Sequence, residues 1–118
     1  LKAWPGVDGK RIGLAGYSFG TSVILGNPNL HKIARAFAFI SPPLRALEST
    51  ALKKSKHSIF IISGDKDKLV QSEQLPSVLD AFSQRPECSI VPGADHFWGG
   101  YENELIPQVG RYFAEHLK

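Results

Sequence analysis

Four short, nearly continuous apolar runs constrain the fold of this chain more than any other feature. They cover residues 11–17, 36–41, 58–63 and 87–91, and each is bounded by glycine, proline or charge. Such runs are typical of strands that are buried on both faces, as in a parallel sheet. Helical patterns follow at residues 19–25, 72–83 and 102–117, with a less clear one around 44–52. The alternation predicts an α/β fold, a parallel β-sheet with flanking helices joined by right-handed crossovers.

The size and composition fit one globular domain over residues 1–118, with 42% hydrophobic and 21% charged residues. The net charge of +3 does not predict a nucleic-acid partner, because the basic residues are dispersed and the cluster Lys53, Lys54 and Lys56 is typical of a solvated surface. No apolar run is long enough to span a membrane. The single cysteine, Cys88, excludes an intrachain disulfide, and we expect a cytoplasmic protein without a membrane partner.

The first strand runs directly into a G-x-S-x-G motif at residues 16–20, and a helix follows. In this context the motif predicts a nucleophile elbow, in which Ser18 stands at the apex of a strained turn and the two glycines relieve backbone crowding. The turn also places Ser18 at a helix N-terminus. The amide of Phe19 has no partner within the helix there, and it is available to stabilise an oxyanion.

A serine hydroxyl needs a general base, and the base needs a carboxylate that orients it. Two aspartates, Asp65 and Asp67, follow the third strand, and His96 follows the fourth. Because the carboxyl ends of parallel strands lie at one edge of the sheet, these loops are expected to converge. The residues alone leave both aspartates open as the acid.

These three motifs, taken in order, resemble the α/β-hydrolase superfamily and, more narrowly, the small lidless esterases similar to dienelactone hydrolases. The resemblance rests on residues 16–20, on the acid turn 64–67 followed by Val70, and on the histidine turn 93–97. It implies that Ser18 is the nucleophile and His96 the general base and then acid. The acid of this family stands three residues after the glycine, which selects Asp67. The resemblance implies no metal and no organic cofactor.

Under the same resemblance, Asp65 is expected to make local turn hydrogen bonds, and so is Asp95. Three aromatic residues flank the expected site, Tyr17, Phe97 and Trp98. They either line the substrate pocket or pack in the core, since aromatic side chains bury large areas in both settings.

Three further histidines compete for the role of base. His31 follows a Gly-Asn-Pro-Asn segment, His57 precedes a strand, and His116 lies in the last helical turn. None of them stands on a loop at the carboxyl end of a strand. We therefore interpret all three as surface residues, with His116 favourably placed near a helix C-terminus.

The resemblance also implies what this sequence lacks. In the superfamily the elbow follows the fifth strand of a larger sheet, whereas only residues 1–9 precede the first strand here. We therefore expect the C-terminal half of an α/β-hydrolase fold without its N-terminal strands and without the second oxyanion donor. Such a chain is predicted to be a poor enzyme by itself, and to form homo-oligomers or to need its missing N-terminal segment.

The predicted function is hydrolysis of an ester or thioester of a small substrate through an acyl-enzyme, with a small-molecule ester as the partner. The alternative is a non-catalytic fragment that serves as a binding or scaffold domain.

Overall fold

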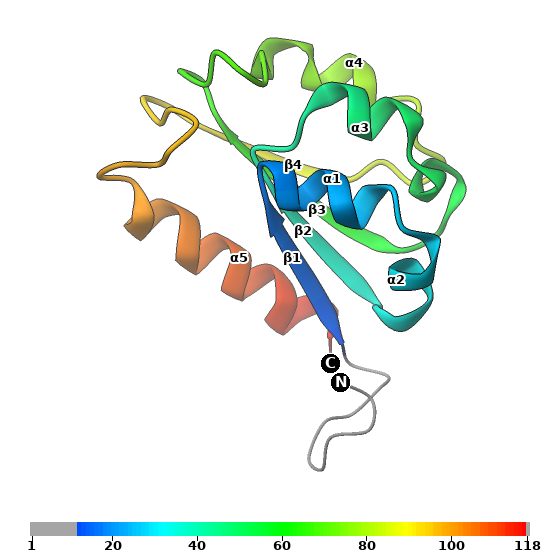
Figure 1. Cartoon of the computed structure of the whole chain (residues 1–118). Helices are drawn as coiled ribbons and strands as arrows, with labels where there is room; N and C mark the ends of the chain where they lie inside the picture. The colour runs from blue at the N-terminus through cyan, green and yellow to red at the C-terminus, as the bar shows by residue number, and fades with distance from the viewer. Residues whose placement is uncertain (1–11, 118) are drawn as a thin grey trace.

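The computed structural model describes residues 12–117, in which strands and helices alternate (Figure 1). The strands are β1 (Gly13–Tyr17), β2 (Ala36–Ile40), β3 (Ser58–Gly64) and β4 (Glu87–Val91). They form one parallel sheet in the order β1-β2-β3-β4. The α/β fold class predicted from the sequence is confirmed, although residue 11, where the first strand was expected to begin, lies outside the described residues.

Helices cover both faces of this sheet. The α-helices are α1 (Phe19–Leu25), α2 (Pro28–Ile33), α3 (Leu44–Ser49), α4 (Leu75–Leu79) and α5 (Glu102–His116), and two 3₁₀ turns are η2 (Ala51–Lys54) and η3 (Ser72–Gln74). Because the strand order follows the sequence, right-handed crossovers place every connecting helix on the same face. Helix α5 follows the last strand and covers the opposite face (Figure 1).

The core is divided by the sheet, and strand β2 supplies side chains to both sides. Its phenylalanines, Phe37 and Phe39, pack beneath α1, α3 and α4, whereas its alanines, Ala36 and Ala38, face α5. All four are fully buried. The alternation follows from the two-residue period of a strand, and the small alanine side chains leave room for α5 and for the aromatic residues that accompany it.

Two helices differ from the sequence prediction. Helix α2 was not expected, yet the Asn27 side chain caps it by accepting a hydrogen bond from the Asn29 amide at 3.1 Å, and Pro28 occupies its first turn. The predicted helix 72–83 is shorter, because the α-helical part ends at Leu79. The Ser83 amide donates to the Lys53 carbonyl at 2.7 Å, which bends the following chain toward η2.

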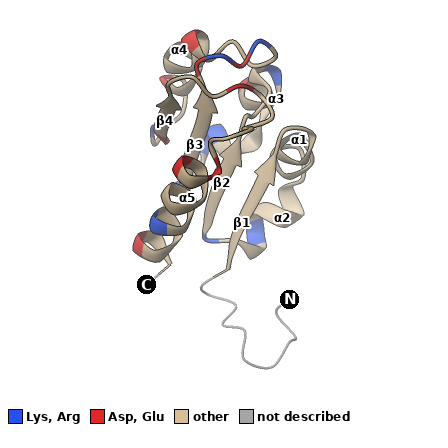
Figure 2. Ribbon diagram, turned by 90° about the vertical axis from the view of Figure 1, so that its left-hand side faces the viewer, with Lys and Arg blue, Asp and Glu red and all other residues tan. Residues whose placement is uncertain are grey.

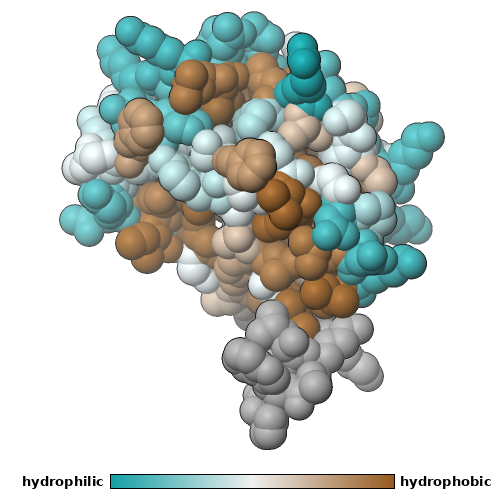
Figure 3. Space-filling view, viewed as in Figure 1, coloured by the Kyte–Doolittle hydropathy of each residue, from teal (hydrophilic) through white to brown (hydrophobic). Residues whose placement is uncertain are grey.

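Among the described residues β1 pairs only with β2, so β1 is an edge strand. Figure 3 shows apolar residues gathered over β1 and the adjoining side of α5. Within residues 12–117 the longest helix has 15 residues, and none is both long and apolar enough to cross a membrane.

Candidate active site

Ser18 lies between β1 and α1 with strained backbone angles, φ 52° and ψ −114°. Its amide donates to the Ile40 carbonyl at 2.9 Å, and its own carbonyl accepts from the Thr21 amide at 3.0 Å, so the turn is fixed on both sides. A Cβ at Gly16 would lie 3.0 Å from the Thr21 amide nitrogen, so this position favours glycine. Gly20 differs from the prediction, since a Cβ there meets no described atom within 4 Å. The crowding is relieved at the first glycine of the motif.

A chain of two hydrogen bonds joins Ser18, His96 and Asp67. The Ser18 Oγ lies 2.7 Å from the His96 Nε2, and the His96 Nδ1 lies 2.9 Å from the Asp67 Oδ2. The Asp67 side chain is fully buried, and that of His96 is 11% exposed. This hydroxyl, imidazole and carboxylate sequence has the geometry that general-base activation of a serine requires.

The Asp67 carboxylate is held by its own turn. Its Oδ1 accepts hydrogen bonds from the amides of Leu69 and Val70, at 2.9 and 3.0 Å. The other oxygen is thereby directed toward His96. Figure 2 shows acidic and basic residues close together on the loop that follows β3, at the carboxyl end of the sheet.

Asp65 has a different task from the predicted local turn bonds. Its Oδ1 accepts from the Gly93 amide at 2.7 Å, 28 residues away, and so connects the acid turn to the histidine turn. The Lys66 amide donates to the Ala94 carbonyl at 2.9 Å in the same region. A Cβ at Gly64 would lie 2.0 Å from the Ala94 carbonyl oxygen. The two turns are therefore in direct backbone contact, which only glycine permits at residue 64.

Asp95 behaves as predicted, because its Oδ1 accepts from the amides of Phe97 and Trp98, each at 3.0 Å. Tyr17, at the end of β1, connects the elbow to the histidine turn. Its hydroxyl donates to the His96 carbonyl, and burial, together with the charges of Asp67 and Asp95, raises its pKa. The hydroxyl therefore stays protonated and remains the donor of this hydrogen bond.

The three aromatic residues predicted near the site differ in exposure. Phe97 is 77% exposed and Tyr17 43%. Phe97 contributes to a hollow of about 240 Å³ beside His96, lined by Lys66, Lys68, Leu69, Asp95, His96 and Phe97. Trp98 is only 2% exposed and belongs to the core beneath α5. Of the two roles considered for Trp98, lining the substrate pocket or packing in the core, the structure shows the second.

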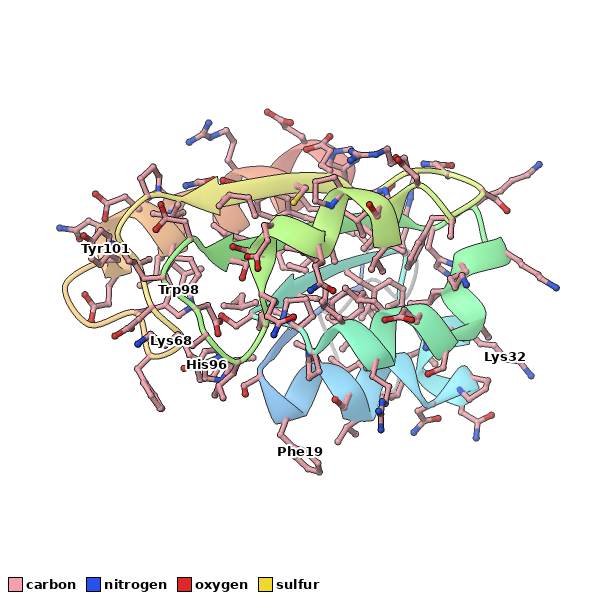
Figure 4. All side chains as sticks on the ribbon, turned by 90° about the horizontal axis from the view of Figure 1, so that it is seen from above. Phe19, Lys32, Lys68, His96, Trp98 and Tyr101 are labelled. Atoms are coloured by element: carbon pink, nitrogen blue, oxygen red, sulfur yellow. The ribbon has the colours of Figure 1, made fainter. Side chains whose placement is uncertain are left out.

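Figure 4 shows His96, Lys68 and Trp98 at one end of the molecule and Lys32, on α2, at the other. The other histidines lie away from Ser18. The prediction that His31 is a surface residue is wrong, because His31 is 7% exposed and its Nε2 bonds the Ile24 carbonyl at 2.6 Å. His57 is half-buried, and its Nε2 bonds the His31 carbonyl at 2.8 Å. His116 is half-buried as well and stacks on Tyr112, with ring centroids 4.1 Å apart.

The Phe19 amide begins helix α1, so it has no acceptor within that helix. This position is compatible with the oxyanion donor expected from the sequence, and that role stays a prediction. In the described part of the chain, no group of three or more His, Cys, Asp or Glu side chains is arranged to hold a metal ion.

Sequence reasoning missed two features of this site. The first is Gly64, whose close approach to Ala94 becomes visible only when the two turns are in place. The second is Ser41, which has a φ of 52° and accepts a hydrogen bond from the Trp98 Nε1 at 3.0 Å. Gly64 belongs to the acid-turn motif, but that motif gives no sign of the contact with Ala94, and no motif marks Ser41.

The sheet, the elbow and the hydrogen-bonded chain of Ser18, His96 and Asp67 define an α/β-hydrolase fold. A family model described as the dienelactone hydrolase family matches residues 1–106. The chain belongs to this family. A comparison with curated proteins gave no significant match.

Solved structures show the same fold. The chain is 26% identical to a protein of unknown function from Agrobacterium tumefaciens described as a candidate α/β-hydrolase, with a TM-score of 0.77, covering 92% of this chain and 51% of that one. It is 27% identical to an α/β serine hydrolase homologue from Coxiella burnetii, with a TM-score of 0.70. The match covers 86% of this chain and 48% of the homologue. A lidless α/β serine hydrolase from Xanthomonas campestris has a TM-score of 0.70 at 24% identity, covering 89% and 47%. The chain thus spans about half the length of these structures.

Proposed function

We propose that this chain carries the catalytic triad of a serine hydrolase that cleaves an ester or thioester of a small substrate. The observation that carries the proposal is the 2.7 Å contact between the Ser18 Oγ and the His96 Nε2, backed by the buried Asp67 carboxylate. The hydroxyl, the imidazole and the buried carboxylate stand in the hydrogen-bonded order by which a Ser-His-Asp triad is recognised.

In the proposed reaction the Ser18 Oγ attacks the acyl carbonyl carbon while the His96 Nε2 takes the hydroxyl proton. The Asp67 carboxylate stabilises the resulting imidazolium and fixes its orientation. The Phe19 amide donates to the oxyanion of the tetrahedral intermediate. His96 then returns the proton to the departing oxygen or sulfur, which leaves an acyl-enzyme.

Deacylation repeats the same steps with water. His96 removes a proton from water, the hydroxide attacks the acyl carbonyl, and Ser18 recovers its proton as the acid product departs. The membership of the chain in a hydrolase family supports this direction of reaction.

A binding or scaffold domain without turnover is the second candidate. One observation favours it: the hollow beside His96, about 240 Å³, is smaller than the roughly 300–1,000 Å³ usual for ligand pockets. The described residues around His96 thus form a shallow surface with limited contact area for a substrate.

A covalent probe separates the two candidates. The full polypeptide, as its gene encodes it, is treated with a fluorophosphonate, and the labelled residue is identified by mass spectrometry. We expect a single adduct on Ser18, hydrolysis of p-nitrophenyl acetate, and loss of both in Ser18→Ala. A folded protein that neither reacts with the probe nor turns over short esters would support the binding domain. A Ser18→Ala variant with a near-normal rate would reject Ser18 as the nucleophile.

A further inference from the structure

Two residues outside the proposed triad, Ser41 and Trp98, combine unusual backbone angles with a shared buried hydrogen bond. Their φ angles are 52° and 61°, a region that side chains other than glycine rarely adopt. The Trp98 Nε1 donates to the Ser41 Oγ at 3.0 Å, and the two residues are 2% and 0% exposed. Such strain persists only where surrounding contacts enforce it, and it gathers at functional sites.

Ser41 is tied to the nucleophile through the sheet. The residue before it, Ile40, accepts the hydrogen bond from the Ser18 amide at 2.9 Å. The Ser41 amide in turn donates to the Ile62 carbonyl at 2.9 Å. These backbone hydrogen bonds therefore hold Ser41 in place next to the elbow.

Trp98 is tied to the base through the histidine loop. Its amide bonds Asp95, and its carbonyl accepts from the Tyr101 amide at 3.0 Å, so the chain around His96 is held on both sides. The indole ring packs in the core beneath α5. The hydrogen bond from the indole N–H to Ser41 thus fixes the position of the histidine loop relative to β2.

We propose that the hydrogen bond between Trp98 and Ser41 positions His96 against Ser18. This inference rests on the proposed function. Neither side chain touches the reacting atoms, so both are positioning residues. The bond joins the histidine loop to the end of β2, where the Ile40 carbonyl holds the Ser18 amide. A displacement of about 1 Å between two reacting groups can reduce a rate about a hundredfold.

The test uses three variants of the full polypeptide: Trp98→Phe, which keeps an aromatic ring without the donor, Ser41→Ala, which removes the acceptor, and the double variant. We expect kcat to fall tenfold to a hundredfold in each single variant, with KM changed less than twofold. The double variant should be no slower than the slower single variant, because either change already breaks the same bond.

A matched control removes a buried hydroxyl far from the site. The Thr50 Oγ1 donates to the Leu25 carbonyl at 2.7 Å. Leu25 is the last residue of α1, at the helix end away from Ser18, and Thr50 follows the last residue of α3. Thr50→Val should lower the melting temperature about as much as Ser41→Ala while leaving kcat per folded molecule within twofold. If Thr50→Val reduces kcat as strongly, the effect is general destabilisation and the proposal is wrong.

A second readout does not depend on turnover. The ring Nδ1 proton of His96, observed by NMR, should shift in Trp98→Phe and Ser41→Ala and stay unchanged in Thr50→Val. Unchanged kcat and an unchanged His96 resonance in both variants would overturn the positioning role while leaving Ser18 chemistry intact. A wild-type protein without turnover or labelling would reject the proposed function, and the His96 resonance would still decide whether the bond positions the ring.

Discussion

Histidines stand at both ends of the sheet, and their partners differ. At the carboxyl end, the ring of His96 lies between two side chains, the Ser18 hydroxyl and the Asp67 carboxylate. At the amino end, His31 and His57 each direct Nε2 at a main-chain carbonyl. A ring nitrogen that bonds a carbonyl must itself carry a proton, so it is not free to accept one. The same residue type therefore supports the fold at one end and, under the proposed function, transfers protons at the other.

The sharpest test of this contrast exchanges one histidine at each end. His96→Ala should reduce kcat for p-nitrophenyl acetate by a factor on the order of 10⁶, the loss seen when a triad base is removed. His31→Gln keeps an N–H donor for the Ile24 carbonyl and should change kcat less than threefold. The rates are compared per folded molecule, with folding followed by circular dichroism. Similar losses in both variants would mean that the two ends do not differ in function.

The two aspartates of the acid turn give the next largest effect. Asp67→Asn should reduce kcat by a factor of about 10⁴, because an amide at this place favours the wrong tautomer of the imidazole. Asp65→Asn keeps an oxygen that accepts from the Gly93 amide, so we expect a loss of tenfold at most. Steady-state kinetics of both variants check this ranking. The reverse order would transfer the role of acid to Asp65.

A glycine pair tests how closely the turns must approach. Gly64→Ala places a Cβ against the Ala94 carbonyl oxygen, so the histidine turn must move, and we expect kcat to fall about a hundredfold. Gly20→Ala serves as the control, because a Cβ there meets no described atom. Its kcat should stay within threefold of the wild type. Full activity in Gly64→Ala would show that the backbone contact between the turns is dispensable.

Much of the architecture is predictable from local patterns. The four strands follow from apolar runs, and Ser18 and His96 follow from their positions after strands. Position alone leaves Asp65 and Asp67 both open, and the choice of Asp67 rests on the family resemblance. The shortened α4 could not be predicted, because a hydrogen bond from Ser83 to Lys53, distant in sequence, bends the chain. Helix α2 does carry a local signal, the capping Asn27 followed by Pro28, although no helix is predicted there.

The errors at single residues have the same cause. His31 is buried because it packs against Phe37, with ring centroids 5.8 Å apart, and polarity alone gives no sign of that contact. Asp65 bonds across 28 residues where a local turn bond was expected. Trp98 could be core or pocket by sequence, and only its burial among the core residues beneath α5 separates the two. Contacts between distant loops are thus the part that sequence patterns leave open.

The smallest predicted effect concerns stability at the amino end. Burial raises the pKa of Tyr112 to about 12, with a further contribution from the charge of Glu87, while the unfolded chain has the ordinary value of 10.0. Between pH 10 and 12 the folded state therefore retains a proton that the unfolded state loses, so stability falls as pH rises through this window.

Tyr112→Phe should remove this slope, which is about 1.4 kcal/mol per pH unit for one proton. The free energy of unfolding in urea, measured from pH 9 to pH 12, checks the expectation. Parallel alkaline slopes in the wild type and the variant would contradict it. Hydrolysis of the ester substrate at pH 8 should be unaffected, since the Tyr112 ring packs on Phe60 beneath the sheet, away from Ser18.

The parallel order of the strands has a consequence for the timing of synthesis. The Ser18 and His96 side chains meet across 78 residues of sequence. During translation β1, β2 and β3 leave the ribosome first, so a nascent chain presents the nucleophile and the acid while the base is still inside the exit tunnel. On the proposed mechanism the hydroxyl remains unreactive throughout this period. Covalent labelling of Ser18 on stalled ribosomes would therefore begin only once β4 and its histidine loop have joined the sheet. The chain length at which labelling begins would then report when this last step of folding occurs.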